Sequence, residues 1–573
     1  MPTTATVLKQ PLLIIVRHFP KLKAAEHEVV ERIAAAANEL GWATRLVDVD
    51  NTFDFKKIAQ FEEDADLVLD IHYEYPKFFK PKSVGAVWTP TSFMLDWDLP
   101  YVWENQLSHD FLAHTDSKKI IDLLSIYRPN EKFSTLNHAI PLAWQSWIDQ
   151  ASRNEVPRAF YAGINWTKLS GRPGRHNRFF EILDKQNVLD IYGPKKIGHV
   201  IPWEGFSSYR GEIPFDGKTI LRKARESGIS LVLSAEQHFK EGVISSRLFE
   251  GLAAGNAIIA DRHPFIIKNL GKTARYLDFD RGDDYAARQL CEYVEEFQTD
   301  NALLIEAQST AASIFEKKFN LTDQLEVVLS TSQKIDTPFD DVGVLVVGSS
   351  KSNILFRLRS LGFTKIEFTN SELFNFQDMQ SLAKSLNFQN FLVLNGNTEF
   401  LDGFGSKLGA LSIRMTKENA QIGVISTVAL SQNGRNFQPV LVPISKSLPL
   451  NGLLIKELSS TFQPKVILDT VPGLRIGTLS EISYASPFQE TYDFLMKVGK
   501  TKESVNVFEE SIRTRVTNEI EKNIVSTSSD IAEEIRRLPK SRKTALALAL
   551  AASIPGIVPL ASLAKWIYRK TGK

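Results

Sequence analysis

Three polar residues stand immediately before a stretch with helical spacing: Ser245, Ser246 and Arg247. An apolar run over residues 229–233 predicts a strand upstream of them, and residues 248–254 predict the helix. A helix N-terminus presents unpaired N–H groups and partial positive charge, which favour the binding of a phosphate. Two hydroxyl groups and an arginine fork add donors for the same anion. The pattern therefore predicts phosphate or diphosphate binding at the start of this helix.

Glu250 lies one helical turn further along, on the face that carries Ser246 or Arg247. A carboxylate there can accept hydrogen bonds from the vicinal hydroxyl groups of a sugar. Two more polar residues, His238 and Glu241, come just before Ser245–Arg247, where we expect a donor sugar. Glu241 is a candidate for sugar binding and catalysis, and a simple interaction with the helix dipole is the alternative. An ordinary strand–helix unit with a capped helix would produce the same pattern.

The segment resembles the nucleotide-binding signature of GT-B glycosyltransferases. The matching pieces are Glu241, Ser245–Arg247, Phe249–Gly255 and the apolar run Ala257–Ala260. The resemblance implies that Glu250 binds the nucleotide ribose and that Arg247 binds the diphosphate. It covers about the first 330 residues of the chain.

The same resemblance implies roles for other residues of this half. GT-B enzymes often touch the diphosphate with basic residues after the first strand of the nucleotide-binding half, which implies that role for Lys168 and Arg172. A solvated basic loop is the alternative. They often hold the base at the end of a strand, where Tyr192 and Gly193 stand here, and a core tyrosine is the alternative.

The resemblance leaves the stereochemistry of transfer open. Retaining members usually place seven residues between the two glutamates of the signature, and eight lie between Glu241 and Glu250. The run Ser245–Phe249 also resembles the Thr-Glu-Lys-Leu-Trp run of inverting fucosyltransferase-like enzymes.

Polar residues also end or follow the apolar strands predicted in the first part of the chain. These residues are Arg17, His18, Asp70, His72 and Glu74. They would line the acceptor side of a cleft, where an inverting transferase needs a general base. His18 and His72 are therefore the candidate bases, and a structural role is the alternative for each.

Short apolar strands alternate with helical segments over the first two predicted domains, residues 1–150 and 151–335. This alternation predicts the α/β class, with a parallel, doubly wound sheet in each domain. Two Rossmann-like domains in tandem are the plan of GT-B enzymes, with the ligand at the carboxyl edges of the strands. The first domain would hold the acceptor and the second the nucleotide sugar.

A third α/β domain is predicted over residues 340–498. It weakly resembles a GT-A glycosyltransferase domain of the family-2 type, which places an Asp-x-Asp metal site after the strand that aligns with residues 391–394. Asn395 and Asn397 stand in those places, and amides are poorer ligands for a hard dication than carboxylates. The domain is interpreted as a degenerate relative, and an unrelated α/β domain is the alternative.

The chain ends with two further segments. Residues 499–540 carry apolar side chains every three or four positions, which predicts an amphipathic helix that packs on the body or pairs with a second copy. In the tail, residues 541–573, an uncharged stretch has basic flanks, and two prolines interrupt it. These features favour a monotopic or re-entrant anchor on an anionic membrane face. A spanning helix and a buried structural helix are the alternatives.

Composition excludes several classes of protein. The 573 residues have a formal net charge of +1, which gives no global attraction to nucleic acid. Cys291 is the single cysteine, which is consistent with a reducing cytoplasm, and the N-terminus has no signal-peptide pattern. The sequence contains no zinc spacing, Gly-x-Ser-x-Gly motif or Walker loop.

These observations together predict a metal-independent glycosyltransferase. It would move a sugar from a nucleotide-diphosphate donor to a glycan or lipid-linked glycan at the cytoplasmic membrane face, with no separate cofactor. One alternative is an inactive scaffold of a polysaccharide assembly complex. Another is a different GT-B-fold enzyme acting on a nucleotide sugar, such as an epimerase.

Overall fold

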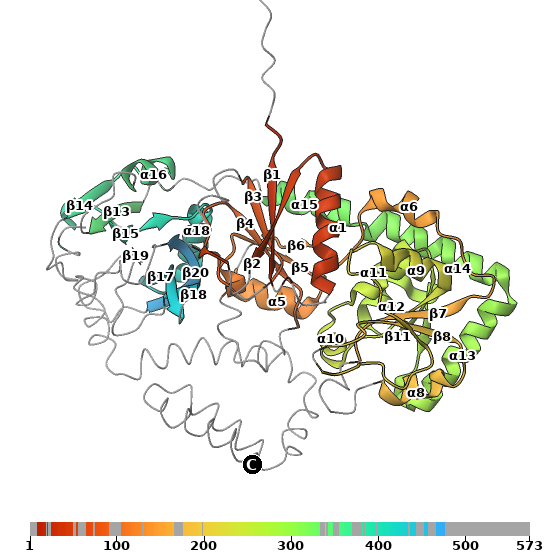
Figure 1. The fold of residues 1–573 in the computed structure, drawn as a ribbon. Coiled ribbons are helices and arrows are strands. Elements are labelled where there is room, and N and C mark those ends of the chain that lie inside the picture. Colours follow the sequence, from red (N-terminus) through yellow and green to blue (C-terminus); the bar gives the residue numbers. More distant parts are fainter. Residues whose placement is uncertain are drawn as a thin grey trace, which may run out of the picture. The chain divides into compact units, whose positions relative to one another are not determined.

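In its described residues, the computed structural model contains three β-sheets with their helices (Figure 1). It describes residues 9–18, 20, 25–49, 53–55, 65–72, 75–90, 105–128, 131–165, 176–197, 199–332, 339, 342–347, 354–369, 381, 384–388, 390–396, 398–433, 436–442, 452–456 and 466–475. The predicted amphipathic segment (499–540) and tail (541–573) lie outside these residues. Among the helices that are described, none is both long enough and apolar enough to cross a membrane.

The first sheet has six parallel strands in the order β2-β1-β3-β4-β5-β6. They are β1 (Leu12–His18), β2 (Ala43–Val49), β3 (Leu67–Asp70), β4 (Ser83–Val87), β5 (Phe111–His114) and β6 (Ser134–Thr135). The chain leaves β1 toward β2 and then returns to the other side at β3. The position between β1 and β3 is therefore the switch point, where open α/β sheets bind ligands at their carboxyl edge.

The second sheet also has six parallel strands, in the order β12-β11-β10-β7-β8-β9. They are β7 (Arg158–Ala162), β8 (Leu189–Tyr192), β9 (Tyr209–Gly211), β10 (Gly228–Val232), β11 (Ala257–Asp261) and β12 (Arg275–Leu277). Counted from β7, this is the Rossmann order, and its switch point lies between β7 and β10. The prediction of two tandem Rossmann-like sheets is confirmed. One detail differs, because the sequence of residues 209–216 predicts a short turn and the structure has strand β9 there.

Helices connect the strands of both sheets. Those of the first domain are α1 (Ala25–Glu39), α5 (Lys118–Tyr127), η2 (Leu142–Trp144) and α6 (Gln145–Asp149). Those of the second are α8 (Asn177–Asp184), α9 (Thr219–Ser227), α10 (Glu236–Glu241), α11 (Ser246–Ala253), α12 (Pro264–Leu270), η3 (Gly271–Thr273), η4 (Phe279–Arg281), α13 (Asp283–Thr299), α14 (Asn301–Ile314), the π-helical η5 (Phe315–Phe319) and α15 (Leu321–Ser332). Helix α11 lies beside the central strands β10 and β11, because its apolar face carries Leu248, Phe249 and Leu252.

The last of these helices, α15, packs on the first domain rather than the second. It contacts α1 and β6. Its start is held by the Leu321 N–H, which donates to the Ile140 carbonyl at 2.8 Å, and the Asn137 N–H donates to Gln324 Oε1 at 2.8 Å. Residues 321–332, which the sequence placed in the nucleotide domain, thus complete the core of the first domain. The chain crosses between the two domains a second time.

The third sheet is mixed, with the path β14-β13-β15-β19-β17-β20-β16 and β18 paired to β17. Its strands are β13 (Val342–Val347), β14 (Ile366–Thr369), β15 (Asn390–Asn395), β16 (Glu399–Phe400), β17 (Ile422–Asn433), β18 (Asn436–Val442), β19 (Gly452–Lys456) and β20 (Val466–Arg475), with helices α16 (Ile354–Ser360) and α18 (Phe404–Lys417). The predicted α/β character is confirmed, and Asn395 ends β15 as expected. Asn397 lies outside the described residues, and the degenerate GT-A interpretation stays a prediction.

Candidate functional site

Helix α11 begins at Ser246, two residues before the predicted start at residue 248. Gly242 ends α10 with a φ of 71°, a left-handed value that favours glycine, and turns the chain toward α11. Ser245 is the N-cap, and its Oγ accepts a hydrogen bond from the Arg247 N–H at 3.4 Å. Ser246 is the first residue of the helix and is half-buried. The strand–loop–helix unit therefore places both hydroxyl groups at the helix N-terminus.

Arg247 spans the switch point of the second sheet. Its Nε donates to the carbonyl of Ala162 at the end of β7, and its Nη1 donates to the carbonyl of Leu233 just after β10, at 3.3 Å. Nη1 also donates to Ser245 Oγ at 2.9 Å, and the guanidinium lies 4.8 Å from the centroid of the Tyr161 ring. The group is half-buried, and within the described part of the chain Nη2 donates no hydrogen bond. The two N–H groups of Nη2 are therefore available at the carboxyl edge of the sheet, where an anion would bind.

A glycine makes room for this guanidinium. A Cβ on Gly163, the residue after β7, would lie 2.4 Å from Arg247 Nη2. No real side chain tolerates that distance, so any larger residue at this position must displace the arginine.

Glu250 is buried and already has a partner in the first domain. Its Oε1 accepts a hydrogen bond from Arg32 Nη2 at 3.0 Å, and Arg32 Nε donates to the Gly217 carbonyl at 3.0 Å. Arg32 is fully buried in α1, and Glu28 Oε2 of the same helix lies 3.8 Å from Nη2. The carboxylate predicted to hold a ribose therefore also joins the two domains, and its nucleotide role stays a prediction.

Glu28 has an unusual environment because of this cluster. Burial raises the pKa of its carboxyl to about 7, and the negative charges of Glu250 and Asp216 add to the rise, although Arg32 opposes it. Two carboxylates thus share one buried guanidinium at the contact between the domains.

His238 and Glu241 lie on α10, which precedes Ser245–Arg247 in the chain. Burial, followed by the positive charge of Arg247, lowers the pKa of His238 to about 4, so the imidazole is neutral near pH 7. Glu241 is buried, and its carbonyl accepts a hydrogen bond from Ser117 Oγ of the first domain at 2.7 Å. The pKa of His138 is lowered to about 3 by burial and then by the charges of Arg32 and His238. His138 of the first domain therefore lies near the donor-side residues.

Tyr192 and Gly193 lie at the end of β8, beside the Arg247 position. The Tyr192 ring is half-buried and lies 5.4 Å from the Phe160 ring, and burial raises the pKa of its hydroxyl. A Cβ on Gly193 would lie 2.3 Å from the Gly163 carbonyl oxygen, so the two strand ends approach closely here. This geometry places both residues at the same carboxyl edge as Arg247.

Two predicted diphosphate ligands, Lys168 and Arg172, lie outside the described residues, as does Glu74. Arg17 is described, and it forms an ion pair with Asp48 at 2.7 Å on the partly exposed side of β1 and β2. It is therefore not part of the candidate site.

His18 and Asp70 meet at the switch point of the first sheet, at the carboxyl ends of β1 and β3. His18 Nε2 and Asp70 Oδ1 are 3.0 Å apart, and both side chains are almost fully buried. Burial would raise the pKa of Asp70, but the His18 interaction and further donors outweigh it and lower the pKa. An ionised carboxylate only accepts, so Nε2 of His18 carries a proton and donates it to Asp70 Oδ1.

His72 lies beside the pair formed by His18 and Asp70. Its backbone N–H donates to Asp70 Oδ1 at 3.0 Å, and its ring centroid lies 5.4 Å from that of His18. Burial and the neighbouring His18 lower the pKa of His72 to about 3, although Asp70 opposes the shift. A group with so low a pKa is a weak base near neutral pH.

Three residues of the two sites were missed in the sequence: Arg32, His109 and His138. Arg32 stands in the middle of a helix, where charged residues usually face solvent, and no local signal marks its partner. His109 precedes β5, and His138 follows β6, so each stands beside a strand end of the first sheet. That position could have marked the two histidines as candidates.

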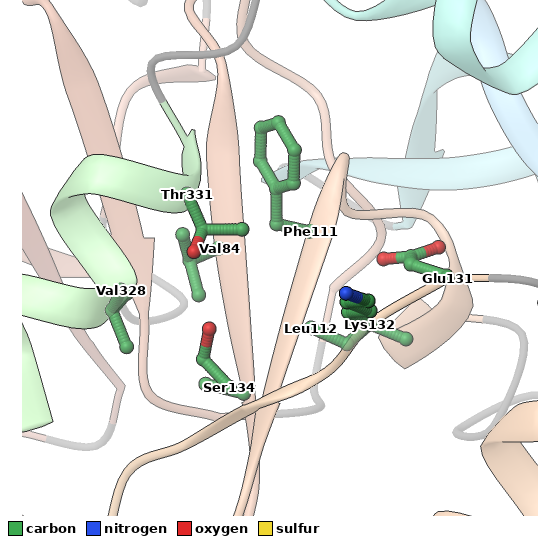
Figure 2. A pocket seen from close by; sticks show the side chains of 9 residues that line it. Val84, Phe111, Leu112, Glu131, Lys132, Ser134, Val328 and Thr331 are labelled. Carbon is green, nitrogen blue, oxygen red and sulfur yellow. The ribbon is translucent and has the colours of Figure 1, made fainter.

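A small pocket opens between α15 and strands β4, β5 and β6, away from both switch points. Figure 2 shows its lining residues, which include Val84, Ser134, Val328 and Thr331. Its cavity volume is about 10 Å³, which accommodates roughly one water molecule. None of the predicted site residues lines it, and it is far too small for a nucleotide sugar.

No group of three or more His, Cys, Asp or Glu residues with metal-binding geometry occurs in the described ranges.

No protein-family model and no curated protein matches the chain. Among solved structures, an alpha-glucosyltransferase in complex with UDP and a 13-mer DNA is 10% identical, with 56% of this chain and 99% of that chain covered and a TM-score of 0.43. A glycosyltransferase from Rickettsia africae is 12% identical, with 57% and 98% covered and a TM-score of 0.40. Sucrose-phosphate synthase from Thermosynechococcus elongatus is 10% identical, with 56% and 99% covered and a TM-score of 0.37. Agreement this low assigns no activity to the chain.

Proposed function

We propose that the protein transfers a sugar from a nucleotide-diphosphate donor to an acceptor hydroxyl. The observation that carries this proposal is the position of Arg247. Its guanidinium bridges the ends of β7 and β10 at the N-terminus of α11, with Nη2 donating to no described residue. A half-buried cation, a helix N-terminus and a switch point at one place form a diphosphate site.

The donor side would work by electrostatic stabilisation. Arg247 and the N–H groups of α11 neutralise the charge that develops on the departing diphosphate, and Ser245 and Ser246 add hydroxyl donors. Lys168 and Arg172 complete the phosphate contacts in this proposal, and Tyr192 with Gly193 adjoins the base. Because this electrostatic work falls to the protein's own groups, the reaction requires no metal ion.

The remaining donor-side residues face the sugars. Glu250 accepts from the ribose hydroxyl groups, in addition to or in exchange for its bond from Arg32. His238 and Glu241 lie where the donor sugar would follow the diphosphate.

The acceptor side would supply the general base. Asp70 holds the proton on Nε2 of His18, so Nδ1 is the atom that can remove a proton from an acceptor hydroxyl. Attack of that hydroxyl oxygen on the anomeric carbon forms the new glycosidic bond and breaks the bond to the nucleoside diphosphate. The proton remains on His18 until solvent removes it. His72 packs beside the pair and stays neutral.

The proposed acceptor is a glycan or lipid-linked glycan at the cytoplasmic membrane face, with the protein bound peripherally through its C-terminal tail. Support comes from the uncharged stretch 544–564 between basic flanks. Deletion of residues 544–573 is expected to release the protein from membranes in cell fractionation. Unchanged fractionation would contradict the membrane part of the proposal and leave the transferase part standing.

Calorimetric titration with UDP, GDP and CMP tests the donor site directly. The wild-type protein is expected to bind one of these nucleotides, and Arg247→Ala to weaken that binding by about 2 kcal/mol, roughly thirtyfold. Arg178→Ala is the matched control, because Arg178 belongs to the same domain but pairs with Asp284 on the surface. Absence of nucleotide binding tighter than millimolar would remove the proposal.

One observation favours a second candidate, an inactive scaffold of a polysaccharide assembly complex. Asn395 ends β15 where the GT-A resemblance implies a metal-binding aspartate, so the third domain would have lost its own catalysis. The first two domains decide between the candidates. Turnover of a nucleotide sugar that Arg247→Ala abolishes excludes the scaffold.

A further inference from the structure

A buried polar chain connects the candidate base to the third domain. Its members are Asp70, His109, Ser83 and Asp110, all of which are at most 4% exposed. Asp70 Oδ1 holds His18, and Asp70 Oδ2 lies 3.9 Å from His109 Nε2, which is a contact and not a hydrogen bond. His109 thus packs against the carboxylate that orients the base.

The chain continues through hydrogen bonds. His109 Nδ1 lies 3.2 Å from Ser83 Oγ, and the Ser83 hydroxyl and N–H both donate to Asp110 Oδ2, at 3.2 and 2.9 Å. Since the serine proton goes to the carboxylate, Ser83 Oγ accepts the proton of His109 Nδ1. The orientation of His109 therefore follows the position of Asp110.

Asp110 is held by two lysines, and one belongs to the third domain. Lys77 donates to Asp110 Oδ2, and Lys407 Nζ, from helix α18, lies 3.0 Å from Asp110 Oδ1. Lys407 is 4% exposed, and its Nζ also donates to the Ser108 carbonyl at 2.6 Å. A long cationic side chain thus leaves its own domain and ends inside another.

The electrostatics agree with a strong attachment. Burial would raise the pKa of Asp110, but the charges of Lys407 and Lys77 outweigh it and lower the pKa to about 2. Both lysines contact Asp110, and burial, joined by the charges of Lys77 and Arg128, lowers the pKa of Lys407 to about 7 although Asp110 opposes the shift. Removal of Lys407 would leave Asp110 with Lys77 as its one lysine partner and would take away the cation beside Oδ1 at a buried position.

Further hydrogen bonds to backbone groups join the third domain to the first domain near Lys407. Lys77 Nζ donates to the Asp402 carbonyl at 2.8 Å, and the Asp402 N–H donates to the Lys80 carbonyl at 2.8 Å. Arg475 Nη1 of β20 donates to the Phe78 carbonyl at 2.8 Å. These bonds join the third domain to residues 77–80, the segment that leads into β4 and Ser83.

We propose that Lys407 is a positioning residue for the base His18 and that the third domain thereby completes the acceptor side. The inference rests on the proposed function for the identity of His18 as a base. It gives the third domain a structural task in the first domain's site that needs no catalysis of its own. Lys407 acts through the buried polar chain and touches no substrate.

Full-length Lys407→Met is the test, because methionine keeps the length and bulk of the side chain and removes its charge. The first measurement is the exchange rate of the His18 ring C2 hydrogen by mass spectrometry, which requires no activity. We expect exchange at least about threefold faster, because Asp70 no longer holds the ring in one position. In turnover, kcat is expected to fall about tenfold to a hundredfold, and KM for the donor to stay within about twofold.

Two further variants serve as a control and as a second test. Lys417→Met, at the exposed end of the same helix, is the matched control and should leave both measurements unchanged. Ser83→Ala breaks the chain inside the first domain and should reproduce the pattern if Lys407→Met fails to fold. Wild-type exchange and kcat in folded Lys407→Met or Ser83→Ala would overturn the inference. A wild-type protein that binds no nucleotide would instead remove the proposed function, and the exchange rate would still decide the Lys407–His18 coupling.

Discussion

Each of the first two sheets has a switch point at its carboxyl edge, but the polar groups there differ in burial and in what holds them. At the second edge Arg247 and Ser245 are half-buried, and backbone holds the arginine: Arg247 donates to two strand-end carbonyls and Ser245 caps a helix. At the first edge His18 and Asp70 are almost fully buried, and side chains hold them. An anion site requires fixed donors that remain accessible, and backbone supplies them. A histidine base requires a fixed tautomer, which a carboxylate partner such as Asp70 can impose.

Asp70→Asn is expected to have the largest effect of the changes that test this contrast. The amide can no longer impose the tautomer of His18, so kcat should fall about a hundredfold to ten-thousandfold. Nucleotide affinity should not change, because the donor groups lie on the other sheet. Steady-state kinetics and calorimetry measure the two effects separately. Asp48→Asn, on the partly exposed neighbour β2, is the control, and an equal loss in both variants would refute the assignment.

The contact between the two domains provides a test through pH. Burial raises the pKa of Glu28 from 4.5 to about 7, so its contribution to stability is complete below pH 4.5 and is lost as the pH rises through 7. The unfolding free energy of wild type relative to Glu28→Gln should therefore fall by about 3 kcal/mol across that window. Urea unfolding at several pH values measures it. Glu31→Gln, on the exposed face of the same helix, should show no such slope, and a pH-independent difference for Glu28→Gln would contradict the prediction.

A pair of glycine substitutions sharpens the contrast with smaller effects. In Gly163→Ala the new Cβ would lie 2.4 Å from Arg247 Nη2, and in Gly85→Ala it would lie 2.6 Å from His109 Cδ2. Gly163→Ala should weaken nucleotide binding by about 1 kcal/mol, several-fold, and leave kcat at saturating donor nearly unchanged. Gly85→Ala should lower kcat and leave nucleotide binding intact. Reversed or identical effects would show that the two edges are not functionally separate.

Chelation of divalent cations is expected to have the smallest effect. In the proposed mechanism Arg247 and the start of α11 supply the positive charge that a metal ion can provide in transferases, so EDTA should change turnover by less than about twofold. Full loss of turnover with EDTA, restored by Mg²⁺ or Mn²⁺, would show that the protein's own donors do not suffice.

Most of the local structure could be predicted from the sequence. Apolar runs bounded by glycine and polar residues identified β10, α11 and β11, and the cap at Ser245 followed from the residue types alone. His18 and Asp70 were found because polar residues that end buried parallel strands collect at one edge. These inferences succeed because neighbours within a few residues determine where helices and strands begin and end.

The partners of buried charges could not be predicted in the same way. Arg32 and Glu250 are 218 residues apart in the chain, and Lys407 and Ser108 are 299 apart. The amphipathic patterns of α1 and α18 show only that one face is buried, and they contain nothing about which charge lies opposite. The crossing of α15 back to the first domain was missed for the same reason.

The sequence by itself determined the order of strands and helices, the two Rossmann-like sheets and the groups at their carboxyl edges, because these follow from local periodicity and from chain direction. Only the tertiary structure decided that Glu250 meets Arg32, that Asp70 meets His18, and that a lysine of the third domain ends beside Asp110. Such contacts depend on how whole domains pack, and the energy of a buried charge is set by every group around it.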